Sequence, residues 1–341
     1  GVLQPVTRTQ VGDDKRSALP RGLLALREND AMHFIQGGLA RLGTLGGAEH
    51  QQRPLAPEFA HAQGSAVERL QYELGQRACV LTVACDRTSN GPHIYYPQPG
   101  APGGTGAAED WVPDAFNRDP WARNAMIETA ERVAKEAGFT KEQQHDIALL
   151  RYQQYQRSLA DDRAFQKRFM VPVSLRRGKK EIGRAVEDEG IHPTTREGLA
   201  KLEPVMPGGT VTFGSQTHPA DGNAGMVLCS EGRARELSAD VKIPVRVVAW
   251  GEGRVEKGFM PKAVVPAARA ALQRAGIAVA DCKVIKTHNP FAVNDLYFCR
   301  EMGLAHDAIN DYGSPLVYGH PQGPRGLRVV LEVIEELAVK G

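Results

Sequence analysis

Apolar and polar positions recur with clear periods in the first half of the chain after residue 60. The run SAVERLQYEL, residues 65–74, predicts a helix, and the continuous apolar run over 78–85 predicts a short buried strand. Two further helices are expected over 121–138 and 139–161. Gly138 is placed to end the first of them, and Thr140 with Gln143 forms a capping box that starts the second.

In the second half the pattern alternates between strand and helix. Strands are expected over 208–214 and 245–253, and a tight turn at 218–223 leads into a strand or helix of small residues. An amphipathic helix is expected over 261–277. The last helix, 325–341, carries one apolar face made of Leu327, Val330, Leu331, Ile334 and Leu337. This alternation is typical of a layered α/β fold.

Two stretches lack a periodic pattern. Residues 1–60 are rich in glycine and poor in β-branched residues, which predicts loop or poorly ordered chain rather than a strand. Residues 88–114 form a long loop rich in proline and glycine. A compact domain keeps so long a loop mainly when it builds or covers a site, so this loop is a candidate part of one.

Composition narrows the class of protein. A chain of 341 residues and 37.0 kDa suits two fused halves or one large α/β domain. The formal net charge of +2 argues against a nucleic-acid binder. No apolar run approaches the roughly 20 residues of a membrane span, and the N-terminus lacks an apolar signal core. Five cysteines without CxxC spacing indicate a reduced, cytoplasmic setting and argue against structural zinc.

Two histidines in rigid turns are the strongest chemical signal. His288 stands in KTHNPFAVND, residues 286–295, and His320 stands in YGHPQGPRG, residues 318–326, directly before the last helix. The helix N-terminus would lower the pKa of His320 and favour the neutral base. His288 could donate a hydrogen bond to an oxyanion from its turn. Each could also be an ordinary turn or half-buried histidine, and the sequence alone leaves both interpretations open.

Five motifs, taken together, resemble the thiolase family in that family's order. They are ACVLTVACDRTSNGP, the helical stretch 126–156 with its continuation over 188–204, GGTVTFG followed by ADGNAG, THNPFA and GHPQGPRG. The resemblance runs from about residue 65 to residue 341. The segments HNPFAVND, THPADGNAG and GHPQGP are most similar to those of the unorthodox thiolases of anaerobic aromatic degradation, which include the benzoylsuccinyl-CoA type.

The resemblance implies a fold of two stacked βαβαβαββ halves in five layers, with a loop domain inserted in the first half. It places the N-terminal half at 1–205, with the loop domain at about 88–205, and an incomplete C-terminal half at 206–341, whose last strands lie beyond Gly341. It implies an acyl-CoA acyltransferase that cleaves or forms a β-keto thioester, with coenzyme A as a substrate and no metal.

The resemblance also implies roles for particular residues. His320 matches the base of the Gly-His-Pro turn, and His288 matches the group that holds the thioester oxygen. Met126, Thr217 and Phe291 match positions that line the pantetheine arm of coenzyme A, although a core Met, a turn Thr and a core Phe are equally good interpretations. A homodimer is implied, as is a small accessory subunit of OB-fold and zinc-ribbon type.

The nucleophilic cysteine of the family has no counterpart in the expected place. It should lie about twenty residues before the strand, where this sequence reads PEFAHAQGSAVERL, with His61 nearest. Cys79 and Cys85 lie in or after that strand, and Cys85 aligns with a non-catalytic position. Three explanations remain open: the active protein differs from this sequence before residue 60 or after residue 341, the protein is a non-catalytic subunit that binds coenzyme A or a partner, or another residue is the nucleophile.

Overall fold

A long two-stranded antiparallel ladder forms the base of the described structure. The structure is a computed structural model that describes residues 79–100, 102–119, 121–239, 243 and 245–341. Strand β1 (Cys79–Arg87) pairs along its whole length with β6 (Asp221–Cys229), from Cys79 opposite Cys229 to Arg87 opposite Asp221. The strand expected over 78–85 is thereby confirmed, but it is not buried, because Leu81 and Val83 on one of its faces are 67% and 58% exposed. The tight turn expected over 218–223 is wrong in its second half, where Asp221 already begins strand β6, and the small-residue segment after it is a strand. The helix expected over 65–74 and the loop expected over 1–60 lie outside the described residues.

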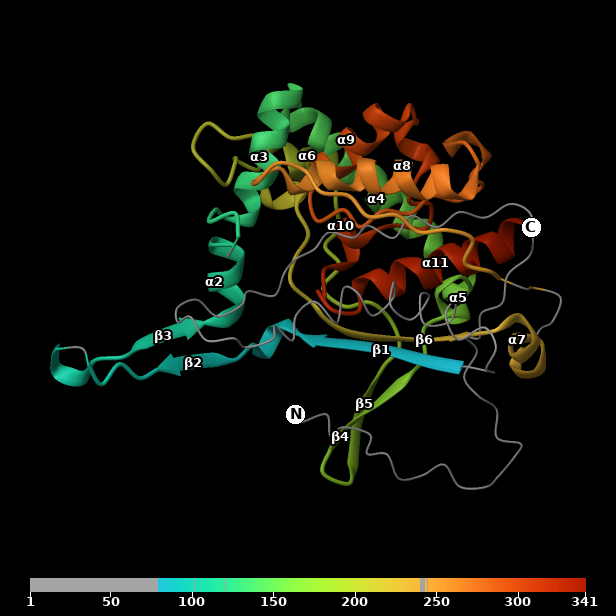
Figure 1. Cartoon of the computed structure of the whole chain (residues 1–341), viewed down its shortest axis with the longest axis horizontal. Coiled ribbons are helices and arrows are strands. Elements are labelled where there is room, and N and C mark those ends of the chain that lie inside the picture. Colours follow the sequence, from blue (N-terminus) through green and yellow to red (C-terminus); the bar gives the residue numbers. More distant parts are fainter. Residues whose placement is uncertain (1–78, 101, 120, 240–242, 244) are drawn as a thin grey trace.

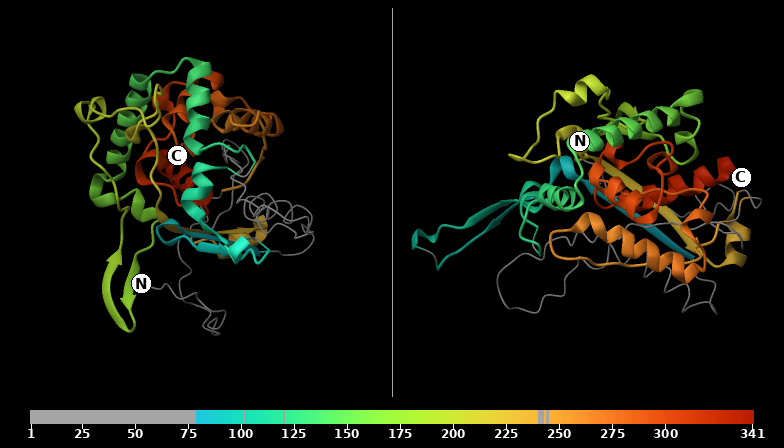
Figure 2. Two further views of the ribbon diagram at one scale, coloured as in Figure 1. Left: turned by 90° about the vertical axis from the view of Figure 1, so that its left-hand side faces the viewer. Right: turned by 90° about the horizontal axis from the view of Figure 1, so that it is seen from above.

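Helix α11 (Arg325–Lys340) lies on this ladder, between it and a layer of other helices (Figures 1 and 2). Leu327, Val330 and Ile334 pack with Met226 and Leu228 of β6 in one apolar cluster. The predicted apolar face of the last helix is thus confirmed in its central part. The opposite face is also buried, because Glu332 and Glu336 are only 2% and 1% exposed, and the sequence pattern gave no sign of that.

The helical layer is organised around α9 (Ala292–Met302), which follows directly on the His288 turn. Buried residues of α9 pack against α3 (Met126–Ala137), α4 (Lys141–Ser158) and α8 (Val264–Ala275) in three separate clusters. The remaining helices are short: α2 (Trp111–Asn117), α5 (Ala160–Arg163), α6 (Arg196–Ala200), α7 (Glu231–Leu237) and α10 (Pro315–Tyr318).

The ends of the helices follow from local sequence. Thr140 Oγ1 accepts a hydrogen bond from the amide of Gln143, and the Gln143 side chain accepts one from the amide of Thr140, so the predicted capping box is confirmed. Gly138 ends α3 in the left-handed conformation at φ 72°, as expected. Helix α3 starts at Met126, five residues later than the sequence pattern indicates.

Two expected strands are wrong. Residues 245–253 carry no strand among the described residues, and the stretch 208–214 holds buried Val211 and Thr212 followed by the short 3-10 turn Phe213–Ser215. Ser215 holds Thr212 through two local hydrogen bonds. The Ser215 hydroxyl accepts from the Thr212 amide and donates to the Thr212 carbonyl oxygen. Side-chain bonding of this kind satisfies the backbone without a neighbouring strand, and β-branched composition alone does not reveal it.

Two hairpins extend away from the helical layer (Figure 1). The loop expected over 88–114 contains the pair β2 (His93–Tyr96) and β3 (Ala107–Asp110), in which Tyr95 lies opposite Ala108. The second hairpin pairs β4 (Val173–Arg177) with β5 (Lys180–Ala185). Among the described residues, no helix is both long and apolar enough to cross a membrane.

Candidate active site

His288 and His320, which are predicted to act together, lie side by side. Their ring centroids are 4.4 Å apart, and the ring planes are inclined by 44°. Within the described part of the chain, Nδ1 of each ring is buried without a hydrogen-bond partner. Buried polar atoms are nearly always hydrogen-bonded in folded proteins, so two such atoms in adjacent rings mark a site that is built to meet another molecule or group.

The segment Gln216–Pro219 joins the two histidine turns. Gln216 forms an isolated antiparallel bridge with Phe291, and Pro219 forms a parallel one with His320. The Thr217 amide donates to the carbonyl oxygen of Pro290 at 2.7 Å, and the His320 amide donates to that of His218 at 2.8 Å. Because one short extended segment is bonded to both turns, the distance between the histidines is fixed by backbone hydrogen bonds.

A buried carboxylate anchors the His288 turn. Asp295 of α9 accepts hydrogen bonds from Thr287 Oγ1 at 2.8 Å and from Asn289 Nδ2 at 2.6 Å, the two residues that flank His288. Asp295 is itself paired with Arg151 Nε of α4 at 2.8 Å, and neither side chain is exposed. Asn289 also binds Ser314 Oγ and the Leu316 amide, which ties the turn to the start of α10.

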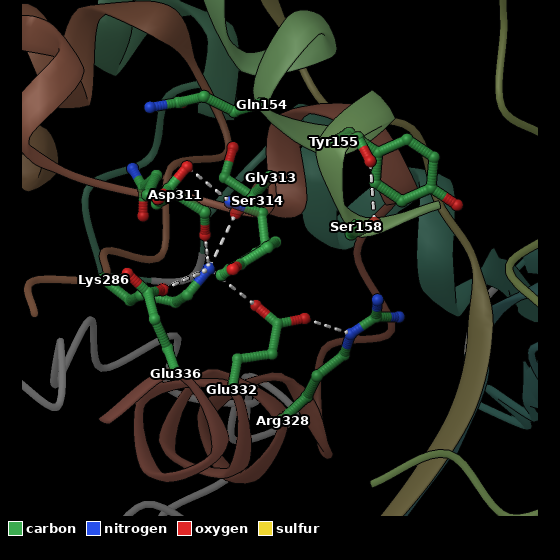
Figure 3. A network of polar contacts seen from close by, with 12 residues as sticks. Gln154, Tyr155, Ser158, Lys286, Asp311, Gly313, Ser314, Arg328, Glu332 and Glu336 are labelled. Atoms are coloured by element: carbon green, nitrogen blue, oxygen red, sulfur yellow. Dashed lines mark hydrogen bonds and ion pairs between the residues drawn. The ribbon is translucent and has the colours of Figure 1, made fainter. Parts of the chain in front are cut away.

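A second buried network holds the backbone two residues before each histidine, and Figure 3 shows its part around Lys286. Lys286 donates to the carbonyl oxygens of Asp311 and Gly313, and its Nζ lies 3.5 Å from Glu332 and 3.4 Å from Glu336. Tyr318 donates to Glu332 at 2.9 Å. The side chains of α11 therefore fix Lys286 and Tyr318, and through them the approach of the chain to both histidines.

The His320 turn requires a glycine. Gly319 has φ +85°, and a Cβ there would lie 2.7 Å from Nε2 of His218. On the far side of the turn, Asp86 at the end of β1 accepts from the amides of Gln322 and Gly323 at 2.7 and 3.3 Å. The turn is thus clamped between the β1–β6 ladder and the segment that carries His218.

Burial keeps the imidazoles of this site neutral. Removal from water lowers the pKa of His288 well below its ordinary value, and His320 and Arg325 lower it further. Burial, and then Arg325, lower the pKa of His320 to about 3. The pKa of His218 is also lowered, first by burial and then by His192 and Arg325. A neutral imidazole has one donor and one acceptor nitrogen, so each can serve either as a base or as a hydrogen-bond donor.

Met126 and Thr217 are each linked to the segment around Phe291, three residues after His288. Phe291 is 6% exposed and belongs to an apolar cluster against which Met126 packs. Thr217 is bonded to Pro290, the neighbour of Phe291, and its hydroxyl donates to the Pro315 carbonyl oxygen at 2.6 Å. These contacts fit both the core interpretation and a role in lining a substrate channel, so the binding roles stay predictions.

The cysteines of the described region divide into two groups. Burial raises the pKa of Cys229, raises that of Cys282 to about 11 and raises that of Cys299 to about 12, so these thiols stay protonated at neutral pH. Cys79 and Cys85 are exposed on β1. No group of three or more metal-ligating side chains occurs among the described residues.

Three functional candidates were missed by sequence reasoning. His218 lies against Gly319, Arg325 donates to the Gly319 carbonyl oxygen, and Asp295 supports the His288 turn. His218 and Arg325 do stand inside the motifs THPADGNAG and GHPQGPRG, so their position was a usable signal. Asp295 lies on the buried side of α9, and the spacing of residues along the sequence does not reveal that its carboxylate is buried and paired.

Comparison with known proteins places this geometry in a family. The family model described as "Thiolase, N-terminal domain" matches residues 71–232, and "Thiolase, C-terminal domain" matches residues 241–341. The chain is 32% identical over 220 residues to the peroxisomal 3-ketoacyl-CoA thiolase A of Mus musculus, covering 62% of this chain and 51% of that protein. It is 34% identical over 232 residues to a 3-ketoacyl-CoA thiolase of Shewanella sp. (strain W3-18-1), covering 66% and 59%.

Comparison with solved structures gives the same fold. The Bacillus anthracis acetyl-CoA acetyltransferase superposes with a TM-score of 0.72 at 25% identity, over 82% of this chain and 70% of that one. Human mitochondrial 3-ketoacyl-CoA thiolase in complex with CoA gives a TM-score of 0.71 at 23% identity, over 83% and 70%. This chain spans between half and three fifths of the length of these curated relatives. The fold is that of the thiolases, and because both domain models match in the family's own order over most of the chain, the protein belongs to the thiolase family.

Proposed function

We propose that the protein is an acyl-CoA acyltransferase of thiolase type, which cleaves or forms a β-keto thioester with coenzyme A as substrate. The observation that carries the proposal is the contact between His288 and His320, two buried neutral imidazoles whose Nδ1 atoms have no partner among the described residues. Thioester carbon chemistry needs a base beside the nucleophile and a donor beside the carbonyl oxygen, and one pair of rings supplies both.

The two rings have different tasks in this proposal. When the carbon–carbon bond next to the thioester breaks or forms, the thioester oxygen gains negative charge, and an N–H of His288 donates to it. His320 takes the proton of the attacking thiol and returns it to the carbon or sulfur that leaves. Its burial holds it unprotonated at neutral pH, which is the protonation state that a general base needs before the reaction. Met126, Thr217 and Phe291 would line the pantetheine arm on the α3 side of the pair.

For the substrate class, the support is the resemblance of the motifs to one group of thiolases. HNPFAVND, THPADGNAG and GHPQGP support an aromatic or dicarboxylic acyl-CoA of the benzoylsuccinyl-CoA type. The relatives are named for 3-ketoacyl-CoA and acetyl-CoA, which agrees with the reaction type.

Substitution of the histidines tests the roles. Asparagine also presents an N–H donor, so His288→Asn should keep substantial activity, whereas His288→Ala should lose roughly 10²-fold or more in kcat with little change in KM. His320→Ala should cut thiolysis by roughly 10²–10⁴-fold while the protein stays folded. If Asn and Ala at position 288 are equally damaging, His288 acts as an acid or base instead; if both are harmless, it is a turn histidine.

A non-catalytic subunit that binds coenzyme A or a partner is the second candidate. It is favoured by the described cysteines, because burial raises the pKa of three of them and makes a nucleophilic thiolate harder to form there. Alkylation with iodoacetamide followed by peptide mapping separates the two candidates. Labelling of one cysteine that acyl-CoA prevents supports the enzyme, and labelling that acyl-CoA does not alter supports the binding subunit.

We further propose a cytoplasmic homodimer, with a small accessory subunit of OB-fold and zinc-ribbon type. The outer face of β1 supports an interface, because Leu81 and Val83 are 67% and 58% exposed on one side of a paired strand. Sedimentation tests the assembly: a mass near the 37.0 kDa of one chain at micromolar protein would exclude the dimer.

A further inference from the structure

Arg325, the first residue of α11, is a buried cation without a counter-ion of its own. Its side chain is 2% exposed. Among the described residues, its Nη2 donates to the Gly319 carbonyl oxygen, while Nε and Nη1 have no hydrogen-bond partner. Its guanidinium also lies 5.0 Å from the centre of the Tyr318 ring. Burying a charge is costly unless it is paired, so two unbonded guanidinium nitrogens in the interior require an explanation.

The nearest acids are already engaged by another arginine. Arg328 binds Asp188 through Nη1 and Nη2 and binds Glu332 through Nε at 2.9 Å. Asp188 and Glu332 raise the pKa of Arg325 only as minor effects, and burial lowers that pKa to about 10. The backbone makes this position still less favourable for the Arg325 charge, because the N-terminal end of a helix carries partial positive charge and disfavours a cation there.

Arg325 lies at the reacting end of the proposed site. It stands five residues after His320 in the same turn, and it holds the carbonyl of the residue directly before His320. It lowers the pKa of His218, His288 and His320 alike, so its charge acts on all three rings. An anion beside Arg325 would therefore sit next to the acyl group rather than at the distant nucleotide of coenzyme A.

We propose that Arg325 is a specificity-determining residue that binds a free carboxylate on the acyl group of the substrate. This inference rests on the proposed function and narrows its substrate class to acyl-CoA thioesters with a second, unesterified carboxylate. Nε and Nη1 lie on different edges of the planar guanidinium, and either of them can bind a carboxylate in a bidentate geometry together with the second N–H of Nη2. The helix N-terminus favours the same negative charge. The neutral histidines beside it add no competing positive charge.

Binding of matched thioesters tests the proposal without requiring turnover. Isothermal titration calorimetry on the full chain compares 3-oxoadipyl-CoA with 3-oxohexanoyl-CoA, which has the same chain length but no terminal carboxylate. We expect the carboxylate ligand to bind the unaltered protein roughly 10- to 100-fold more tightly, the range of one or two hydrogen bonds to a charged group. Arg325→Met should abolish that preference, so that the two thioesters bind the variant with affinities within about twofold of each other.

Control variants separate recognition from folding. Arg325→Lys keeps the charge but not the bidentate geometry, so it should retain only part of the preference. Arg269→Met removes an exposed arginine of α8, 59% exposed, and should leave both affinities unchanged. Arg325→Met removes a buried charge without a counter-ion but also the hydrogen bond to the Gly319 carbonyl oxygen, so its unfolding temperature should stay close to that of the unaltered protein. A clearly lower temperature would assign Arg325 a structural role and overturn the proposal.

The remaining outcomes are distinct. If both thioesters bind equally to the unaltered protein, the carboxylate subsite is wrong while the proposed function stands. If neither thioester nor free coenzyme A binds, the proposed function itself fails. If Arg325→Met weakens free coenzyme A as much as it weakens 3-oxoadipyl-CoA, the anion that Arg325 meets is a coenzyme A phosphate, and the proposal is overturned.

Discussion

Replacing Asp295 by asparagine removes the charge that holds the His288 turn. Asp295 accepts from Arg151 Nε at 2.8 Å, from Thr287 Oγ1 at 2.8 Å and from Asn289 Nδ2 at 2.6 Å. Asn310 Nδ2 lies 3.4 Å from each of its oxygens. All of these groups are donors, and they converge on one carboxylate that is 0% exposed.

The cost follows from the chemistry of the replacement. An asparagine keeps one acceptor oxygen and turns the other into an NH₂ donor, which then faces donors. Arg151, whose side chain is also 0% exposed, becomes an uncompensated buried charge. Breaking a buried ion pair from one side typically costs about 3–5 kcal/mol, so Asp295→Asn should reduce the free energy of unfolding by about that much.

The chain provides a matched control. Asp146 pairs with Arg196 at 2.7 Å, nearly the same distance, but the two side chains are 56% and 68% exposed. Exposed pairs contribute about 0–1 kcal/mol because solvent screens them. Asp146→Asn makes the same chemical change as Asp295→Asn, so the difference between the two variants isolates the effect of burial.

Urea unfolding followed by tryptophan fluorescence measures both variants. We expect a loss of about 3–5 kcal/mol for Asp295→Asn and less than about 1 kcal/mol for Asp146→Asn. Losses of equal size in the two variants, or a loss below about 1 kcal/mol at position 295, would refute the reasoning. In that case the carboxylate would not be what fixes the His288 turn.

Other predictions concern the pH dependence, one glycine and one cap. Burial lowers the folded-state pKa of His320 to about 3 and lowers that of His288 well below its ordinary value. As the pH falls below about 6.5, the unfolded chain therefore binds protons that the folded chain does not. The contribution of the two rings to stability is complete above that pH and is lost as the pH falls toward 3. His320→Gln should reduce the slope of unfolding free energy between pH 6 and 4 by up to about 1.4 kcal/mol per pH unit, and an unchanged slope would show that the ring is solvated. Gly319→Ala should destabilise by roughly 2–3 kcal/mol, from its φ of +85° and the close approach of the new Cβ to His218, whereas Gly303→Ala, with φ +68° and nothing within 4 Å, should cost only about 1 kcal/mol; similar melting temperatures for the two variants would contradict the steric argument. Thr140→Ala should cost about 1 kcal/mol through loss of the α4 cap, which thermal unfolding can test.

Sequence alone was sufficient where the determining interactions are local. The strand β1, the helices α3, α4, α8 and α11, the cap at Thr140 and the stop at Gly138 all follow from periodicity and from contacts within a few residues. The motifs around His288 and His320 also identified the family, because each motif is a contiguous stretch of chain.

Tertiary structure alone decided how those turns work together. The ring contact of His288 with His320 depends on Gln216–Pro219 bonding to both turns, and these segments are distant in sequence. The burial of charged side chains was equally hidden, because a helical pattern treats Glu332 and Arg325 as polar positions, whereas the packing of α11 between two layers buries both. The strand expected at 208–214 failed for the same reason: strand formation needs a partner, and local composition cannot say whether the fold provides one.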